Sequence, residues 1–210
     1  MIQVILTDLG NVLTPFNRYR AADRLSRELV SMHADEIDRL LNLDEQAKKA
    51  LYELETGAMK FDEFRIFMGK RFGSDLPKTN FAEIWADIFT RNEPVIRLWS
   101  RALERNHKLR LYALSDTDPI RLEWIIKLSG LSFAGAAASF MFGVRKPNRR
   151  MYKEAVSLAG CKPDECFFVD DVARYVQAAG EYGLVAHHYN LEDANRDDDL
   201  SAKLAHLNLL

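Results

Sequence analysis

Short apolar runs alternate with amphipathic stretches along most of this chain. The apolar runs have the length and the β-branched or aromatic content of buried parallel strands; they are Ile2–Thr7, Leu109–Leu114, Phe133–Ala138, Cys166–Val169 and Leu184–His188. Between them lie stretches with helical periodicity, namely Val95–Asn106, Pro119–Ser129, Asn148–Ala159 and Val172–Tyr182. The alternation of strands and helices in the second half predicts an α/β fold, a doubly wound parallel sheet with helices on both faces.

The segment between about residues 15 and 92 interrupts this alternation. It contains amphipathic helical patterns, such as Asp35–Leu43 and Phe61–Phe72, and no strand-like run. We therefore expect an α/β core formed by residues 1–14 and 93–210 and an inserted all-helical cap formed by residues 15–92. Because the first strand precedes the cap and its partners follow it, the cap should lie at the carboxyl end of that strand, where open α/β sheets bind their ligands.

The composition restricts the possible partners of the protein more than it restricts the fold. The 210 residues are 48% hydrophobic, which allows one core with an insertion. The 29 basic and 31 acidic residues give no electrostatic reason to expect nucleic acid or an anionic membrane as a partner. Without an export segment or a membrane-length apolar run, and with Cys161 and Cys166 interpreted as reduced thiols, we expect a cytoplasmic protein. The pattern does not indicate an oligomeric state.

Polar residues that suit phosphoryl transfer follow the predicted strands. Asp8 ends the first strand, Ser115 the second and the pair Asp170-Asp171 the fourth, while Lys146 lies in a loop after the third. Because the carboxyl ends of parallel strands meet at one edge of a sheet, these side chains should converge. An aspartate can serve as the nucleophile, magnesium binds carboxylate oxygens, and an ammonium and a hydroxyl can neutralise and position the phosphoryl group.

Four segments in this order carry a recognisable pattern. They are ILTDLGNVL at residues 5–13, LYALSD at 111–116, GVRKP at 143–147 and FFVDD at 167–171. Together they resemble the motifs of the haloacid dehalogenase superfamily, in the branch with a helical cap inserted after the first motif. The segments ETG at 55–57 and FDEF at 61–64 also resemble a recurrent part of that cap, so the resemblance covers nearly the full chain.

The resemblance implies catalytic roles at four positions. Asp8 would be the nucleophile and Lys146 would balance the negative charge around it. Ser115, Asp116 and Lys146 would bind the phosphate of the substrate. The implied activity is that of a phosphatase for a small phosphorylated metabolite, such as a sugar phosphate, with an aspartyl-phosphate intermediate.

The resemblance also implies a magnesium site. Its ligands would be the carboxylates of Asp8 and Asp171 and the backbone carbonyl of Gly10. Asp170 would be an alternative ligand, or it would contact the metal ligands without binding the metal itself. Magnesium is therefore the expected cofactor, and the expected partner is a small phosphorylated molecule.

Two positions depart from the pattern of the phosphatases in this superfamily. Those enzymes usually place a second aspartate two residues after the nucleophile, where it protonates the leaving oxygen, and this chain has Gly10 there. Tyr175 occupies a position that is often Asn or Asp. Two alternatives stay open: a catalytically impaired relative that acts as a binding or regulatory protein, and, with less support, a haloacid dehalogenase. The acidic pair speaks against the dehalogenase.

Some residues of the expected cap allow a structural and a functional interpretation. Arg18 and Arg20 follow the first motif and would either meet the distal part of a substrate or belong to a solvated helix start. Phe61, Phe64, Phe67 and Phe72 recur at near-helical spacing. That spacing predicts that they form the core of the cap.

Overall fold

The computed structural model describes residues 1–29 and 32–210 and contains one parallel sheet. Its strand order is β3-β2-β1-β4-β5, and the strands are β1 (Val4–Thr7), β2 (Arg110–Ser115), β3 (Gly135–Ala138), β4 (Cys166–Asp170) and β5 (Val185–His188). The prediction of a doubly wound parallel sheet is confirmed. β1 begins later than predicted, at Val4, because the neighbouring strands begin at its partners Arg110 and Cys166. β3 likewise begins at Gly135, opposite Tyr112.

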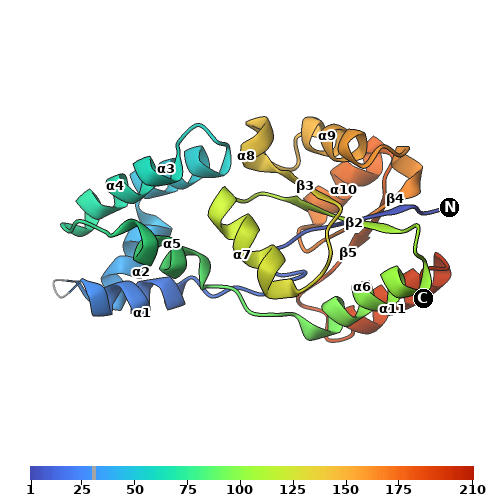
Figure 1. Cartoon of the computed structure of the whole chain (residues 1–210), viewed down its shortest axis with the longest axis horizontal. Coiled ribbons are helices and arrows are strands. Elements are labelled where there is room, and N and C mark those ends of the chain that lie inside the picture. The colour runs from blue at the N-terminus through green and yellow to red at the C-terminus, as the bar shows by residue number, and fades with distance from the viewer. Residues whose placement is uncertain (30–31) are drawn as a thin grey trace.

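Helices cover both faces of the sheet (Figure 1). One face is covered by α6 (Glu93–Arg105), α7 (Pro119–Ser129) and α11 (Arg196–His206), and the other by α9 (Arg149–Ala159) and α10 (Ala173–Tyr182). The short α8 (Ser139–Phe142) follows β3, and the 3-10 helix η1 (Pro163–Glu165) precedes β4. Because both faces are covered, the strands are continuous apolar runs rather than alternating ones.

The inserted segment is helical, as the sequence predicts. It contains α1 (Tyr19–Glu28), α2 (Ala34–Leu43), α3 (Glu45–Glu55), α4 (Phe61–Phe72) and α5 (Lys78–Ala86), all between β1 and α6. In Figure 1, β1 runs from the N-terminus toward these helices. The helical cap therefore lies beyond the carboxyl ends of the strands, which is the edge where the candidate residues were expected.

An aromatic cluster forms the centre of the cap. The rings of Phe64 and Trp85 lie 4.8 Å apart, and those of Phe81 and Trp85 lie 5.9 Å apart. Phe64 and Phe72 are buried, as the near-helical spacing predicts, while Phe61 and Phe67 are only partly buried. Each such aromatic pair contributes roughly 0.5–1.5 kcal/mol beyond the burial of its surface. The cap is therefore stabilised by contacts of its own and not only by the α/β core.

Two connecting segments join the cap to the core and lie side by side. The backbone N–H of Thr90 donates to the carbonyl of Pro15 at 2.8 Å, and Phe16 and Phe89 form an antiparallel bridge with their rings 5.8 Å apart. Each segment satisfies backbone groups of the other, which would otherwise need water. We propose that the boundary between core and cap lies in this pair, near residues 14 and 92.

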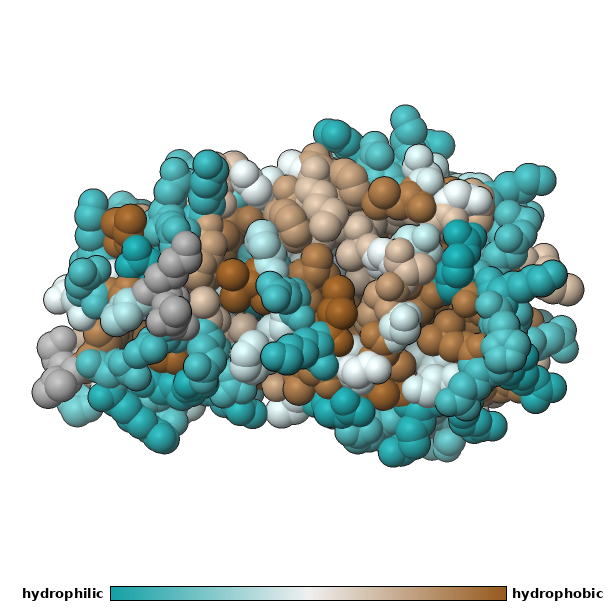
Figure 2. All heavy atoms as spheres, viewed as in Figure 1, coloured by the Kyte–Doolittle hydropathy of each residue, from teal (hydrophilic) through white to brown (hydrophobic). Residues whose placement is uncertain are grey.

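The surface shown in Figure 2 is mainly hydrophilic at both ends of the molecule, with hydrophobic residues gathered toward the middle of the face. The helices of the described residues are all too short or too polar to cross a membrane.

Candidate active site

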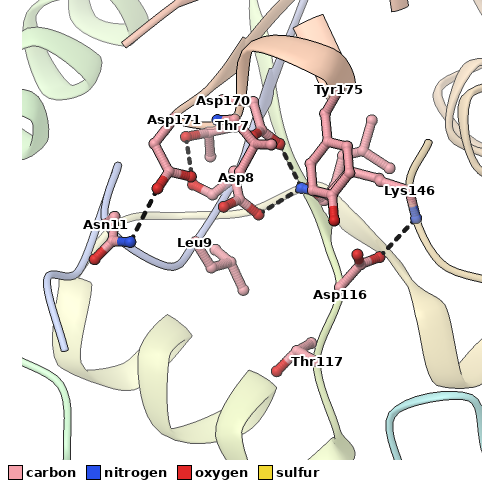
Figure 3. A network of polar contacts seen from close by, with 12 residues as sticks. Thr7, Asp8, Leu9, Asn11, Asp116, Thr117, Lys146, Asp170, Asp171 and Tyr175 are labelled. Atoms are coloured by element: carbon pink, nitrogen blue, oxygen red, sulfur yellow. Dashed lines mark hydrogen bonds and ion pairs between the residues drawn. The ribbon is translucent and has the colours of Figure 1, made fainter. Parts of the chain in front are cut away.

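The structure brings Asp8, Lys146 and Asp170 into direct contact at the carboxyl edge of the sheet (Figure 3). The ammonium Nζ of Lys146 donates to Asp8 Oδ1 at 2.8 Å and to Asp170 Oδ2 at 2.5 Å. It also donates to the carbonyl of Leu114 at 3.1 Å. All three charged side chains are buried, with Lys146 only 4% exposed. One lysine therefore links groups that are more than a hundred residues apart in the chain.

This convergence follows from the order of the strands. β1 carries Asp8 and is hydrogen-bonded to β4, which carries Asp170. The backbone N–H of Asp8 donates to the carbonyl of Val169 at 2.9 Å, so the strand pairing continues into the site. The chain turns from one side of β1 to the other between β3 and β4. Ligands of open α/β sheets bind at such a switch point.

Burial and charge oppose each other at this cluster. Burial disfavours the charged form of Lys146, but Asp170 and Asp8 outweigh that effect and raise its pKa. Burial raises the pKa of Asp170 to about 7, against the influence of Lys146. Burial also raises the pKa of Asp171. The lysine is therefore protonated at physiological pH, while burial opposes the ionisation of Asp170 and Asp171.

The donor set of this cluster fits a divalent cation. Asp8, Asp170 and Asp171 each offer an oxygen, and these atoms lie within 4.8 Å of one another. Both oxygens of Asp170 are already engaged, one with Lys146 and the other with the N–H of Val172 at 2.8 Å. Hard oxygen ligands at this spacing suit magnesium.

Asp171 differs from Asp170 in the hydrogen bonds of its two carboxylate oxygens. Its Oδ2 accepts a hydrogen bond from Asn11 Nδ2 at 2.9 Å (Figure 3). Its other oxygen has no hydrogen bond to any residue that the structure describes. Asp171 also lines the cavity described below, which Asp170 does not. The geometry thus favours Asp171 over Asp170 as a direct ligand.

The turn after Asp8 explains the placement of Gly10 and Asn11. The N–H groups of Leu13 and Thr14 both donate to the carbonyl of Leu9, which closes the turn. Asn11 has a φ of 57°, a left-handed conformation that asparagine tolerates better than most residues.

Gly10, in contrast, is not in the left-handed region. A Cβ atom at this position would lie 3.4 Å from the ring of Phe16. The backbone conformation therefore does not require glycine here, and the ring of Phe16 would be the nearest neighbour of a Cβ atom at this position.

Ser115 and Asp116 follow β2 and have different surroundings. Ser115 is buried and lines the cavity, and its hydroxyl has no hydrogen-bond partner among the described residues. Asp116 Oδ1 accepts the backbone N–H of Lys146 at 2.9 Å, and its Oδ2 lies 3.3 Å from Arg145 Nε. Asp116 therefore holds the loop that carries Lys146, and its predicted contact with a phosphate stays a prediction.

A cavity of about 200 Å³ opens beside the cluster, between the core and the cap. The residues on its core side include Asp8, Gly10, Ser115 and Lys146. The cavity is also lined by Phe16, Arg18, Glu55, Arg121 and Arg145. Of the two arginines with an open interpretation, Arg18 lines the cavity, while Arg20 pairs with Asp87 at 3.3 Å.

The structure also places at this cavity four residues to which the sequence pattern assigned no role, Asn11, Glu55, Arg121 and Arg145. Arg121 stands in a largely apolar helical stretch, and a charged residue there is a signal for a buried ion pair. Tyr175 is buried, and the Nζ of Lys146 lies 5.3 Å from the centre of its ring. The position that departs from the superfamily pattern thus supplies an aromatic face to the lysine.

The matches to known proteins extend over most of the chain. The model of the haloacid dehalogenase-like hydrolase family matches residues 2–183. A D-ribitol-5-phosphate phosphatase of Bacteroides thetaiotaomicron is 25% identical over 194 residues, which cover 88% of this chain and 90% of the relative.

Solved structures share the fold. A haloacid dehalogenase family enzyme of Bacteroides thetaiotaomicron, in complex with magnesium and inorganic phosphate, has a TM-score of 0.74 at 22% identity, over 92% of this chain and 96% of that one. An L-2-haloacid dehalogenase of Xanthobacter autotrophicus has a TM-score of 0.65 at 17% identity, over 100% of this chain and 85% of that one.

Proposed function

We propose that this chain, which belongs to the haloacid dehalogenase-like hydrolase family, is a magnesium-dependent phosphatase of a small phosphorylated metabolite. The observation that carries the proposal is the contact of Asp8 with Lys146, beside Asp171 and facing a cavity. Support comes from a relative that acts on the phosphate of a sugar alcohol and from a fold relative that contains magnesium and phosphate.

In this proposal Asp8 is the nucleophile. Its free carboxylate oxygen attacks phosphorus, the bond between phosphorus and the ester oxygen breaks, and the alcohol leaves with a proton from water or a nearby group. Water then attacks phosphorus, the bond to Asp8 breaks, and inorganic phosphate is released. Lys146 neutralises charge and holds the orientation of Asp8, and the unpaired hydroxyl of Ser115 donates to a phosphoryl oxygen.

Asp8, Asp171 and the carbonyl of Gly10 would hold magnesium, which would supply positive charge at the phosphoryl oxygens when bound. The experiment that tests the function is a screen of phosphorylated metabolites for phosphate release, with magnesium and with EDTA. Magnesium-dependent release from at least one small ester is expected. Turnover of 2-haloacids without metal would favour the dehalogenase instead, and binding without turnover would favour a regulatory protein.

Substitution of the acidic pair should separate the roles of its two members. We expect Asp171→Asn to raise the magnesium concentration needed for half-maximal activity by about 10- to 100-fold, because one charged ligand is lost. Asp170→Asn should change that concentration less and lower the melting temperature more, since Asp170 pairs with the buried Lys146. Titrating magnesium against activity in both variants is the measurement. Hydrolysis that resists EDTA would contradict the assignment.

The absence of an acid at Gly10 should make the rate depend on the leaving group. Without a positioned carboxyl group, the leaving oxygen departs with much of its negative charge, so esters of acidic alcohols should react faster. We expect kcat/KM to fall steeply from aryl to alkyl phosphates in the natural chain.

Gly10→Asp should flatten this dependence, because it places a carboxyl group that can donate a proton at a position where the backbone conformation does not require glycine. The measurement is kcat/KM for a graded series of phosphate esters in both proteins. A flat dependence in the natural chain, with chemistry rate-limiting, would show that another group supplies the proton.

A further inference from the structure

A charged wall stands in the cavity at the border of cap and core. Glu55 is the last residue of α3 in the cap, Arg121 belongs to α7, and Arg145 precedes the lysine of the cluster. The carboxylate of Glu55 lies 3.2 Å from Arg145 Nη1 and 3.7 Å from Arg121 Nη1. Glu55 and Arg121 are only 6% and 7% exposed. We call these three residues the charged wall.

Contacts with neighbouring residues fix the position of the charged wall. The guanidinium of Arg121 lies 3.8 Å from the centre of the Trp85 ring, and Trp85 Nε1 donates to Asp118 Oδ2 at 3.0 Å. Ser139 Oγ donates to the backbone carbonyl of Glu55 at 2.5 Å, which ties the end of α3 to the core. A binding group that is already ordered loses little conformational entropy when a ligand arrives.

The hydrogen-bonding capacity of the charged wall is largely unused. In the described part of the chain, the side chains of Glu55, Arg121 and Arg145 form ion pairs but no hydrogen bond that meets ordinary geometry. Arg121 Nε is buried and lies 3.6 Å from Asp118 Oδ2, but it donates no hydrogen bond to any residue that the structure describes. A carboxylate offers about four acceptor sites and a guanidinium five donors, so both kinds of site remain for a ligand.

We infer that the charged wall binds hydroxyl groups on the part of the substrate beyond the phosphate, so that the substrate is a phosphorylated polyol. A hydroxyl can donate to Glu55 and accept from Arg121 or Arg145. A carboxylate is disfavoured, because the two guanidinium groups already pair with three carboxylates, those of Glu55, Asp116 and Asp118. The inference rests on the proposed function, because it takes the phosphate to lie at Asp8 and Lys146. A site built to bond hydroxyls rejects an analogue that lacks them, since its own polar groups are then left unpaired.

Kinetics with two alkyl phosphates test this inference. The substrates are a pentitol 5-phosphate and n-pentyl phosphate, which have the same chain length and both release a primary alcohol. We expect kcat/KM to be at least about 100-fold higher for the pentitol phosphate. Glu55→Gln should lower the ratio of the two values by about 10- to 100-fold, because a charged acceptor is lost. Glu53→Gln, on the same helix but away from the cavity, is the matched control.

Calorimetry separates this inference from the proposed function. In the Asp8→Asn protein, pentitol 5-phosphate should bind more tightly than n-pentyl phosphate, and adding Glu55→Gln should remove most of the difference. This result would support the charged wall even if no ester were turned over. The inference would be overturned by equal binding of the two compounds, by an equal effect of Glu55→Gln on both, or by a preference for 3-phosphoglycerate. In each of these cases, phosphate release by the natural chain would still support the phosphatase.

Discussion

Replacing Asp8 with asparagine is expected to lower kcat by at least about 10³-fold while the protein remains folded. The amide is a poor nucleophile, and it is also a neutral ligand at a site where the surrounding carboxylates must hold a cation. Lys146 keeps its contact with Asp170 in this variant, so the buried ammonium is still paired. The measurement is phosphate release from the best substrate of the screen, with circular dichroism to follow the fold.

Asp198→Asn is the matched control, because Asp198 is exposed on α11 and away from the cavity. It should retain the activity of the natural chain. If Asp8→Asn kept more than about a tenth of that activity, Asp8 could not be the nucleophile, since removal of a catalytic group usually costs about 10²-fold or more.

Replacing Lys146 with methionine should affect both activity and stability. The substitution leaves Asp8 and Asp170 buried without their cation, and breaking a buried ion pair in this way costs about 3–5 kcal/mol. For a chain of this size that corresponds to a fall of about 6–20 °C in melting temperature. Activity should fall by about 10²-fold or more, because the positive charge beside the phosphoryl group is lost.

The loss of stability in Lys146→Met should depend on pH in a defined direction. Burial raises the pKa of Asp170 in the folded state above its value in the unfolded chain, and loss of the lysine removes the influence that opposes this. The folded variant then binds more protons than the unfolded chain, so its stability falls as the pH rises.

We therefore expect a smaller loss of melting temperature at pH 5 than at pH 8, measured by thermal unfolding. Lys153→Met is the matched control, because Lys153 is exposed on α9. A loss that did not change between these pH values would contradict the role of the lysine as the partner of two buried carboxylates.

The proposed site divides its tasks between two parts of the chain. The core supplies Asp8 and the acidic pair from the ends of its strands and Lys146 from a loop, and the cap supplies Glu55 from the end of a helix. Paired connecting segments join the two parts beside the cavity. In such an arrangement, reaction chemistry and substrate choice can change separately, which is why the tests of Asp8 and of Glu55 use different readouts.

Much of the fold could be predicted because strong local patterns agree with it. The helices α4 and α7 have the predicted bounds, since Gly73 and Gly130 end them in left-handed conformations and Pro119 begins α7. The start of β1 was predicted too early, because pairing partners in other strands determine where a ladder begins. Apolar character alone does not contain that information.

The candidate site could be predicted where residues stand at strand ends or within the four recognised motifs. Asp8, Ser115 and the acidic pair follow apolar runs, so parallel topology was enough to bring them together. Arg121 and Glu55 stand within helices, and their places in the cavity depend on how α7 and α3 pack. Helix periodicity indicates which face is apolar, but not which neighbour a charged residue on that helix will meet.

The sequence by itself determined the α/β class, the helical insertion, the family resemblance and the set of candidate catalytic residues, because each rests on local pattern or on motif order. Only the tertiary structure decided that Asp171 keeps a free oxygen while Asp170 does not, that Gly10 is not required by its backbone, and that Glu55 faces two arginines. These properties depend on distances between segments far apart in the chain. Such distances are set by packing of the whole molecule, which no local pattern encodes.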